Sequence, residues 1–344
     1  MRAKVFLINN TFQYLLFIIT IGFLTGCSKG NEPEDKSSSF GIYLLEDQSI
    51  TWEDLKTRNL DSLKLKDWIT DDKIDFYDYS THVIYLNVDY NTLFSVPHND
   101  NTPFVVVANE KRCYYGRFSP PQDTTQPHVV IKPLELCNDL VMLEFNPPHR
   151  KDIRVKDTIK IALEKLGKLK NGMNIYLNRV PNIDYINSTR LRIEFSASAI
   201  NLDDKVLLIP QCKGDMIKVG SRIYYSRVIL YNNYNFFAFK GHWDGCNADT
   251  LDLSSPLIKY QLTSIPTKLH IGSSSFHDFP LENLPNGNYY CYHELYGLMG
   301  GSKSLRQTVT DGRIWVGYSR SNTINFDYDS SKGVTLVNKN IILE

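Results

Sequence analysis

Most of the chain beyond residue 190 consists of short runs of β-branched and aromatic residues that are separated by turn-forming residues. In the first run, Leu191, Ile193 and Phe195 alternate with charged neighbours, which indicates a strand that buries one face. Later runs of the same kind occur at residues 206–209, 223–230, 236–239, 289–292 and 313–318. A succession of short strands joined by turns favours a β-sandwich.

The preceding segment, residues 40–150, mixes predicted strands with short helical starts. Strands are predicted at residues 40–45, 81–87, 128–132 and 140–145. Thr51 and Asp54 have the spacing of a capping box, which indicates the beginning of a helix. Two further strand-like runs flank Asn109-Glu110-Lys111, which predicts a hairpin with a three-residue loop. These residues therefore predict a small α+β domain.

A boundary is predicted near residue 150, because the adjacent residues Pro147 and Pro148 disfavour helix and interrupt strand pairing. Asp157 is expected to cap a short helix that Gly167 ends. The apolar positions of this helix fall on one face: Ile159, Ala162, Leu163 and Leu166. We therefore expect an α+β fold class, with an α+β domain at residues 40–150 and an all-β sandwich with a short leading helix at residues 151–344.

The N-terminus carries a targeting signal. Arg2 and Lys4 precede an apolar stretch whose uninterrupted part, residues 14–24, is about half the length needed to span a bilayer. It ends in Leu24-Thr25-Gly26-Cys27, which resembles the lipobox of bacterial lipoproteins. The resemblance implies that residues 1–26 are a signal peptide, removed before Cys27, and that acyl chains on Cys27 anchor the protein to a membrane. The alternatives are a plain secretory signal and an uncleaved anchor.

Residues 27–39 are small, polar and charged, which predicts a flexible spacer. The acidic residues after Cys27 are similar to the export tag of surface lipoproteins in Bacteroidota. This resemblance implies an outer membrane lipoprotein, on either the cell surface or the periplasmic face.

The second half of the chain resembles, in its pattern, the immunoglobulin-like domains of uncharacterised Bacteroidota envelope lipoproteins. Its turn and strand at residues 284–292 are also similar to a segment in the sandwich of bacterial intracellular proteinase inhibitors. Both resemblances imply an immunoglobulin-like fold and give little information about activity. The charge balance, with 38 Lys and Arg against 38 Asp and Glu, gives no basic excess for binding nucleic acid.

The densest polar cluster contains His242, Asp244 and Cys246, which could ligate a metal or form a nucleophile pair. On a strand, residues four apart are separated by about 13 Å, and the chain has no HExxH or CxxC to complete such a site. A turn that closes a hairpin is the simpler interpretation.

Other polar residues of the second half are interpreted as structural. They are the isolated His270, His277 and His293, the serines at residues 273–275 with Asp278, and the glycine-rich segment 297–304. The serines lie outside a Gly-x-Ser-x-Gly nucleophile turn, and the glycines lack the spacing of a phosphate-binding loop. We therefore assign no catalytic residue, no metal site and no cofactor, and Cys27 is the one site residue.

The cysteines after Cys27 number five, so at least one must be free or paired between molecules. Outside the cytoplasm disulfides can form among Cys113, Cys137, Cys212, Cys246 and Cys291, and buried free thiols are the alternative.

Aromatic residues make up 12% of the chain, and the pairs Tyr114-Tyr115, Tyr224-Tyr225 and Tyr289-Tyr290 should each place one ring on each face of a sheet. These features favour a lipid-anchored, noncatalytic cell-envelope protein that binds a glycan or another envelope protein. The alternatives are an extracytoplasmic hydrolase with a site between the domains, which would use His242, Asp244 or the later histidines, and a protease-inhibitor-like sandwich.

Overall fold

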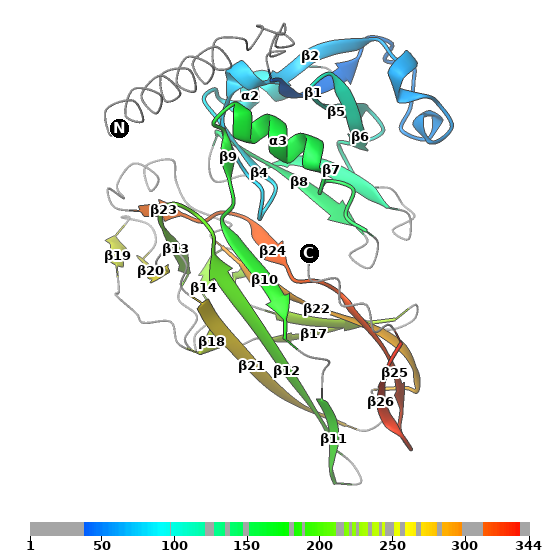
Figure 1. Cartoon of the computed structure of the whole chain (residues 1–344), viewed down its shortest axis with the longest axis vertical. Helices are drawn as coiled ribbons and strands as arrows, with labels where there is room; N and C mark the ends of the chain where they lie inside the picture. Colours follow the sequence, from blue (N-terminus) through cyan, green and yellow to red (C-terminus); the bar gives the residue numbers. More distant parts are fainter. Residues whose placement is uncertain are drawn as a thin grey trace, which may run out of the picture. The chain divides into compact units, whose positions relative to one another are not determined.

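A computed structural model describes the backbone of residues 38–96, 98–120, 127–134, 138–146, 151–178, 182–187, 190–210, 217–219, 222–224, 227–232, 236–240, 243–244, 251–254, 259–265, 270–280, 284–297 and 312–337. All of these residues belong to one compact unit, Ser38–Glu344. The chain is β-rich and forms several sheets (Figure 1). The predicted signal peptide and most of the predicted spacer lie outside the described residues.

Nine of the described strands form one mixed sheet in the order β2-β1-β5-β6-β7-β8-β4-β3-β9. Their bounds are β1 Phe40–Leu45, β2 Leu65–Thr70, β3 Ile74–Asp78, β4 Val83–Leu86, β5 Pro103–Ala108, β6 Lys111–Arg117, β7 His128–Pro133, β8 Leu140–Asn146 and β9 Leu169–Lys170. The strands predicted at residues 40–45, 81–87, 128–132 and 140–145 are confirmed as β1, β4, β7 and β8.

Short helices lie between the strands of this sheet along the chain. They are the 3₁₀ helices η1 Asp54–Lys56, η2 Leu60–Ser62 and η3 Asp71–Lys73, and the α-helices α2 Tyr90–Phe94 and α3 Asp157–Lys165. The capping box before η1 is confirmed, since the Thr51 amide donates to Asp54 Oδ2 (2.8 Å) and the Asp54 amide donates to Thr51 Oγ1 (3.3 Å). Each of these two residues thereby satisfies an amide of the other.

The hairpin between β5 and β6 is confirmed, but its loop is shorter than expected. Ala108 pairs directly with Lys111, which leaves the two-residue loop Asn109-Glu110. Both loop residues have positive φ, 49° and 64°, as a type I′ turn requires. The prediction of a three-residue loop was wrong because Lys111 continues the ladder of β6.

Helix α3 covers one face of the nine-stranded sheet (Figure 1). Its Ile159, Ala162 and Leu163 are fully buried, as their spacing predicted. Asp157 is not the capping residue; it is the first residue of the helix, where its carboxylate favours the positive end of the helix dipole. Helix α3 and strand β9 follow the boundary predicted near residue 150 yet pack on this sheet, and the division into domains stays a prediction.

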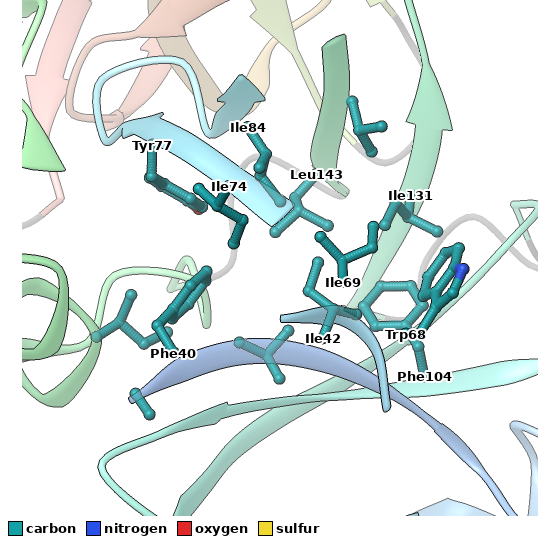
Figure 2. Close-up of a cluster of buried hydrophobic side chains, with 14 of the residues drawn as sticks. Phe40, Ile42, Trp68, Ile69, Ile74, Tyr77, Ile84, Phe104, Ile131 and Leu143 are labelled. Atoms are coloured by element: carbon teal, nitrogen blue, oxygen red, sulfur yellow. The ribbon is translucent and has the colours of Figure 1, made fainter. Parts of the chain in front are cut away.

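The core under α3 combines aromatic and branched side chains (Figure 2). It includes Phe40, Ile42, Trp68, Phe104 and Leu143, of which the most exposed retains only 3% of its surface. Phe40 and Tyr77 meet edge to face, with ring centroids 5.6 Å apart. Because these large side chains are buried together, the sheet and α3 pack as two layers around a shared core.

The later strands form four further sheets within the described residues. One contains β10 Met173–Leu177, β11 Asn182–Asn187, β12 Arg190–Asn201, β18 Trp243–Asp244 and β21 His270–Pro280. A second contains β16 Arg227–Tyr231, β17 Phe236–Lys240, β22 Gly287–Tyr296, β24 Tyr318–Arg320, β25 Ile324–Asp329 and β26 Gly333–Leu336. The smaller ones contain β13 Val206–Pro210, β19 Leu251–Ser254, β20 Lys259–Ile265 and β23 Gly312–Ile314, and the pair β14 Ile217–Val219 and β15 Arg222–Tyr224.

Two predicted strands are each divided in two. The run 223–230 spans β15 and β16, and the run 313–318 spans the end of β23 and the start of β24. Gly317 lies between β23 and β24 with φ +91°, and a Cβ there would come within 2.8 Å of Val83. The chain therefore bends at Gly317, where a residue with a side chain would be strained.

Candidate functional site

The described part of the chain contains a cavity of about 780 Å³. Its lining comes from the β3–β4 connection, the segment between β8 and α3, strand β10 and strand β24 with the residues that follow it. We call it the β10–β24 cleft. Its size lies within the range of small-ligand sites.

Arg154 and Asp152 form the charged floor of the β10–β24 cleft. The Arg154 Nη2 group lies 2.5 Å from Asp152 Oδ2, and Nε donates to both carboxylate oxygens at 3.0 and 3.1 Å. Arg154 Nη1 also donates to the carbonyl of Leu143, and its guanidinium lies 5.8 Å from the ring of Phe145. These contacts hold the arginine in one orientation.

The pKa values of this pair follow from burial and mutual attraction. Burial alone would raise the pKa of Asp152, but the charge and hydrogen bonds of Arg154 outweigh burial and hold that pKa well below its usual range. Burial likewise opposes the charge of Arg154, and Asp152 outweighs it, so the pKa of Arg154 rises. Both groups are therefore ionised at neutral pH.

His82 lies beside this pair in a left-handed backbone conformation, with φ 53°. Its Nδ1 is 2.8 Å from the hydroxyl of Tyr77, and its Nε2 is 4.0 Å from Asp152 Oδ2. Burial, and then the nearby charge of Arg154, lower the pKa of His82 to about 3, although Asp152 acts in the opposite direction. His82 is consequently neutral at physiological pH.

Arg320 also lines the cleft. Its Nε donates to Glu294 Oε1 (3.0 Å), its Nη1 to the carbonyl of Phe145 (2.8 Å) and its Nη2 to the hydroxyl of Tyr318 (3.3 Å). Tyr318 in turn donates to Glu144 Oε1 at 2.9 Å. These bonds join β24 to β8 and fix the arginine in place.

A buried charge cluster supports the base of the cleft. Arg313 Nη1 lies 2.7 Å from Asp78 Oδ2, and its Nη2 lies 2.5 Å from Asp203 Oδ2. Both carboxylate side chains are 0% exposed. Next to them, Ser80 accepts from the indole N–H of Trp315 (3.0 Å) and from the Met173 amide (3.2 Å). These contacts connect the β3–β4 region to β10 and to the C-terminal strands.

The predicted polar cluster of the second half is not gathered into a site by the described residues. His242 and Cys246 lie outside them, and Asp244 pairs with Gly272 in the ladder of β18 and β21. His270 and His277 both lie on strand β21, where seven residues span about 23 Å, so they are far apart.

The remaining candidates are located as follows. His293 is buried, and burial lowers its pKa to about 3. Residues 273–275 and Asp278 lie on the continuous strand β21, and only Gly297 of the glycine-rich segment 297–304 is described. Among the described residues, no group of three His, Cys, Asp or Glu side chains could hold a metal ion.

Cys113 and Cys291 are free thiols. Cys113 is half-buried, and Cys291 is buried in the core of the later sheets. Burial raises the pKa of both thiols. Cys137, Cys212 and Cys246, like the predicted lipidation site Cys27, lie outside the described residues.

The tyrosine pairs behave as strand geometry predicts where side chains are described. Tyr289 is fully buried, and its neighbour Tyr290 lies half-buried in a different cluster, stacked on Tyr231 with ring centroids 5.4 Å apart. Tyr114 is buried and Tyr115 is half-buried. Tyr224 has only its backbone described, and Tyr225 lies outside the described residues.

No motif in the sequence marks the residues that line the β10–β24 cleft. Asp152 and Arg154 are two positions apart, an ordinary spacing, and the other charged or titratable residues of the lining, such as His82 and Arg320, are distant from them in the chain. The one local signal is that Asp152 and Arg154 follow two prolines and precede a helix, a position typical of functional loops.

No helix within the described ranges is both long and apolar enough to cross a membrane. Comparison of the chain with protein-family models, with curated proteins and with solved structures found no match.

Proposed function

We propose that this chain is a lipid-anchored protein of the outer membrane that binds a glycan in the β10–β24 cleft without transforming it. The lipobox resemblance at Leu24-Thr25-Gly26-Cys27 and the polar spacer at residues 27–39 support the anchor. A tether of this kind keeps a folded binding unit close to the membrane, where envelope and extracellular glycans are found.

The observation that carries the binding proposal is the composition of the cleft. Its lining includes amide side chains, which donate and accept hydrogen bonds, together with partly exposed tyrosine rings: Asn171, Asn174, Asn322, Tyr79 and Tyr176. Tyrosine rings offer flat apolar surfaces to the faces of sugar rings, and amides match hydroxyl groups.

The pKa directions favour binding over hydrolysis. General acid catalysis needs a carboxyl group with a raised pKa, whereas the pKa of Asp152 is lowered by Arg154. A histidine base works best with a pKa near neutrality, whereas burial lowers that of His82 to about 3. These two groups are suited to hydrogen bonding with fixed charge states.

An immunoglobulin-like sandwich for the second half remains part of this proposal. Its support is a shared core, since Met173 and Ala197 of one sheet pack in the same cluster as Leu230 and Phe326 of another. Two sheets that bury their facing side chains together are typical of sandwiches.

Two experiments test the proposal. Mass spectrometry of the mature protein should show acyl groups on Cys27, and a Cys27→Ala variant should lack them. Intact cells treated with a nonpenetrating protease should lose the chain if it faces outward, while a periplasmic control protein survives. An unacylated wild-type N-terminus would refute the anchor.

For the binding function, the full chain in detergent micelles is applied to an array of neutral and acidic polysaccharides. Tyr176→Ala should weaken binding about tenfold because a ring contact is lost. Tyr43→Ala, which removes a half-buried tyrosine from strand β1 outside the cleft, is the matched control. Absence of binding to any glycan, or equal effects of the two variants, would refute the cleft as a glycan site.

A further inference from the structure

The charge of the β10–β24 cleft indicates which kind of glycan would bind there. Three cationic side chains line it, Arg154, Lys160 and Arg320, against one carboxylate, Asp152. Glu294, which pairs with Arg320, stands behind the lining and is only 2% exposed. A ligand in the cleft therefore meets more positive than negative groups.

Both arginines keep donors for a ligand. A guanidinium has five N–H groups, and Arg154 uses one on each of its three nitrogens, for Asp152 and for the carbonyl of Leu143. Arg320 uses one on each nitrogen as well, for Glu294, Phe145 and Tyr318. Two N–H groups on each arginine therefore remain without a hydrogen bond to any described residue.

The remaining donors are held in place before any ligand arrives. Arg154 and Arg320 bond to the carbonyls of Leu143 and Phe145 on strand β8, and their side chains are 11% and 19% exposed. Fixed, partly desolvated guanidinium groups bind carboxylates more strongly than exposed lysines do, because little side-chain entropy is lost.

Lys160 adds a third positive charge to the lining of the cleft. It lies on the exposed face of helix α3, and its ammonium group has no ion-pair partner among the described residues. Asp152 is 27% exposed and can accept a hydrogen bond from a sugar hydroxyl.

We propose that the β10–β24 cleft selects a glycan that carries carboxylate groups, with Arg154, Arg320 and Lys160 as the groups that recognise the carboxylates. This inference rests on the proposed function and specifies its ligand. Asp152 and the amides of the cleft then bind hydroxyl groups, and the tyrosine rings contact the faces of the sugars.

The test compares uronate polysaccharides with neutral versions of themselves. The full chain in detergent micelles is titrated with polygalacturonate, alginate and hyaluronan, and with the carboxyl-reduced form of each. At least one acidic polymer should bind ten or more times more tightly than its reduced form. The preference should shrink between 20 mM and 150 mM salt, because added salt screens the partly exposed charges.

A pair of variants on α3 locates the effect. Lys160→Glu should weaken binding of the acidic polymer about tenfold, because an attractive charge becomes a repulsive one. Lys165→Glu makes the same charge change on the same helix outside the cleft lining and should leave the affinity unchanged. Both lysines are exposed, so neither substitution removes a buried contact.

The outcomes separate this inference from the proposed function. Equal binding of acidic and reduced polymers, or equal effects of the two lysine variants, would overturn the selection for carboxylates while glycan binding stands. Loss of binding to every acidic and neutral polymer would overturn both. Displacement of polygalacturonate by polyglutamate or inorganic phosphate as readily as by free galacturonate would show a general anion site, and the inference would be wrong.

Discussion

Lowering the pH from 7 to 5 should destabilise the protein because two buried histidines resist protonation. Burial is the main cause that lowers the pKa of both His82 and His293 to about 3. In the unfolded chain these groups titrate near pH 6.5. Between pH 6.5 and pH 3 the unfolded state therefore binds more protons than the folded state, and stability falls as the pH falls.

The size of the effect follows from the two pKa values. At pH 5 each unfolded histidine lies 1.5 pH units below its titration point, which corresponds to about 2 kcal/mol per group. His82 and His293 together should cost about 4 kcal/mol of unfolding free energy, a large part of the 5–15 kcal/mol typical of folded proteins. Carboxylates contribute little in this window, because they titrate mostly below it.

Urea unfolding at pH 7 and pH 5, followed by tryptophan fluorescence, measures the loss, since Trp68 and Trp315 are buried. A His82→Asn variant should lose about half of the pH dependence. Asparagine adopts the positive φ of position 82 more readily than most residues and takes up no proton. The matched control is His98→Asn at an exposed position.

Two results would refute the reasoning. If the His82→Asn variant kept the full difference between pH 7 and pH 5, the buried imidazole would not be its source. If His98→Asn removed as much of the difference as His82→Asn, burial would not be the controlling factor.

Two further substitutions probe how the cleft is supported. Arg313→Met should lower the unfolding free energy by about 3–5 kcal/mol, because Asp78 and Asp203 would remain as buried charges without their cation. Adding Asp78→Asn and Asp203→Asn should restore the midpoint of urea unfolding. An unchanged unfolding free energy in Arg313→Met would contradict this account. Gly172→Ala should lower the melting temperature by several degrees, because position 172 has φ +55° and a Cβ there would lie 2.2 Å from Ser80 Oγ. An unchanged melting temperature would show that Ser80 moves aside freely.

Features that depend on neighbours in sequence were predicted well. The Thr51 and Asp54 capping box, the buried face of α3 and strands β1, β4, β7 and β8 each follow from interactions within a few residues. The errors arose where the surroundings shifted a boundary. Lys111 joined β6 because it pairs with Ala108, and that pairing belongs to the sheet rather than to the loop.

The candidate site could not be predicted in the same way. Its charged residues come from the β3–β4 connection, the segment after β8 and strand β24, and they meet only when distant strands pack. No sequence motif marks His82 or Arg320 as part of a site, although each has a tyrosine partner within five residues, Tyr77 and Tyr318 respectively. The composition does not mark these residues either, because the chain has equal numbers of basic and acidic residues.

By itself the sequence determined where strands and turns form, since alternation and turn residues act over a few positions. The tertiary structure decided which charges become buried and with what partner. Arg313 meets Asp78 and Asp203 across more than a hundred residues of chain, and Arg320 meets the carbonyl of Phe145. Such pairs form because a buried charge must find an opposite charge or a hydrogen-bond partner, and only packing determines which one is within reach.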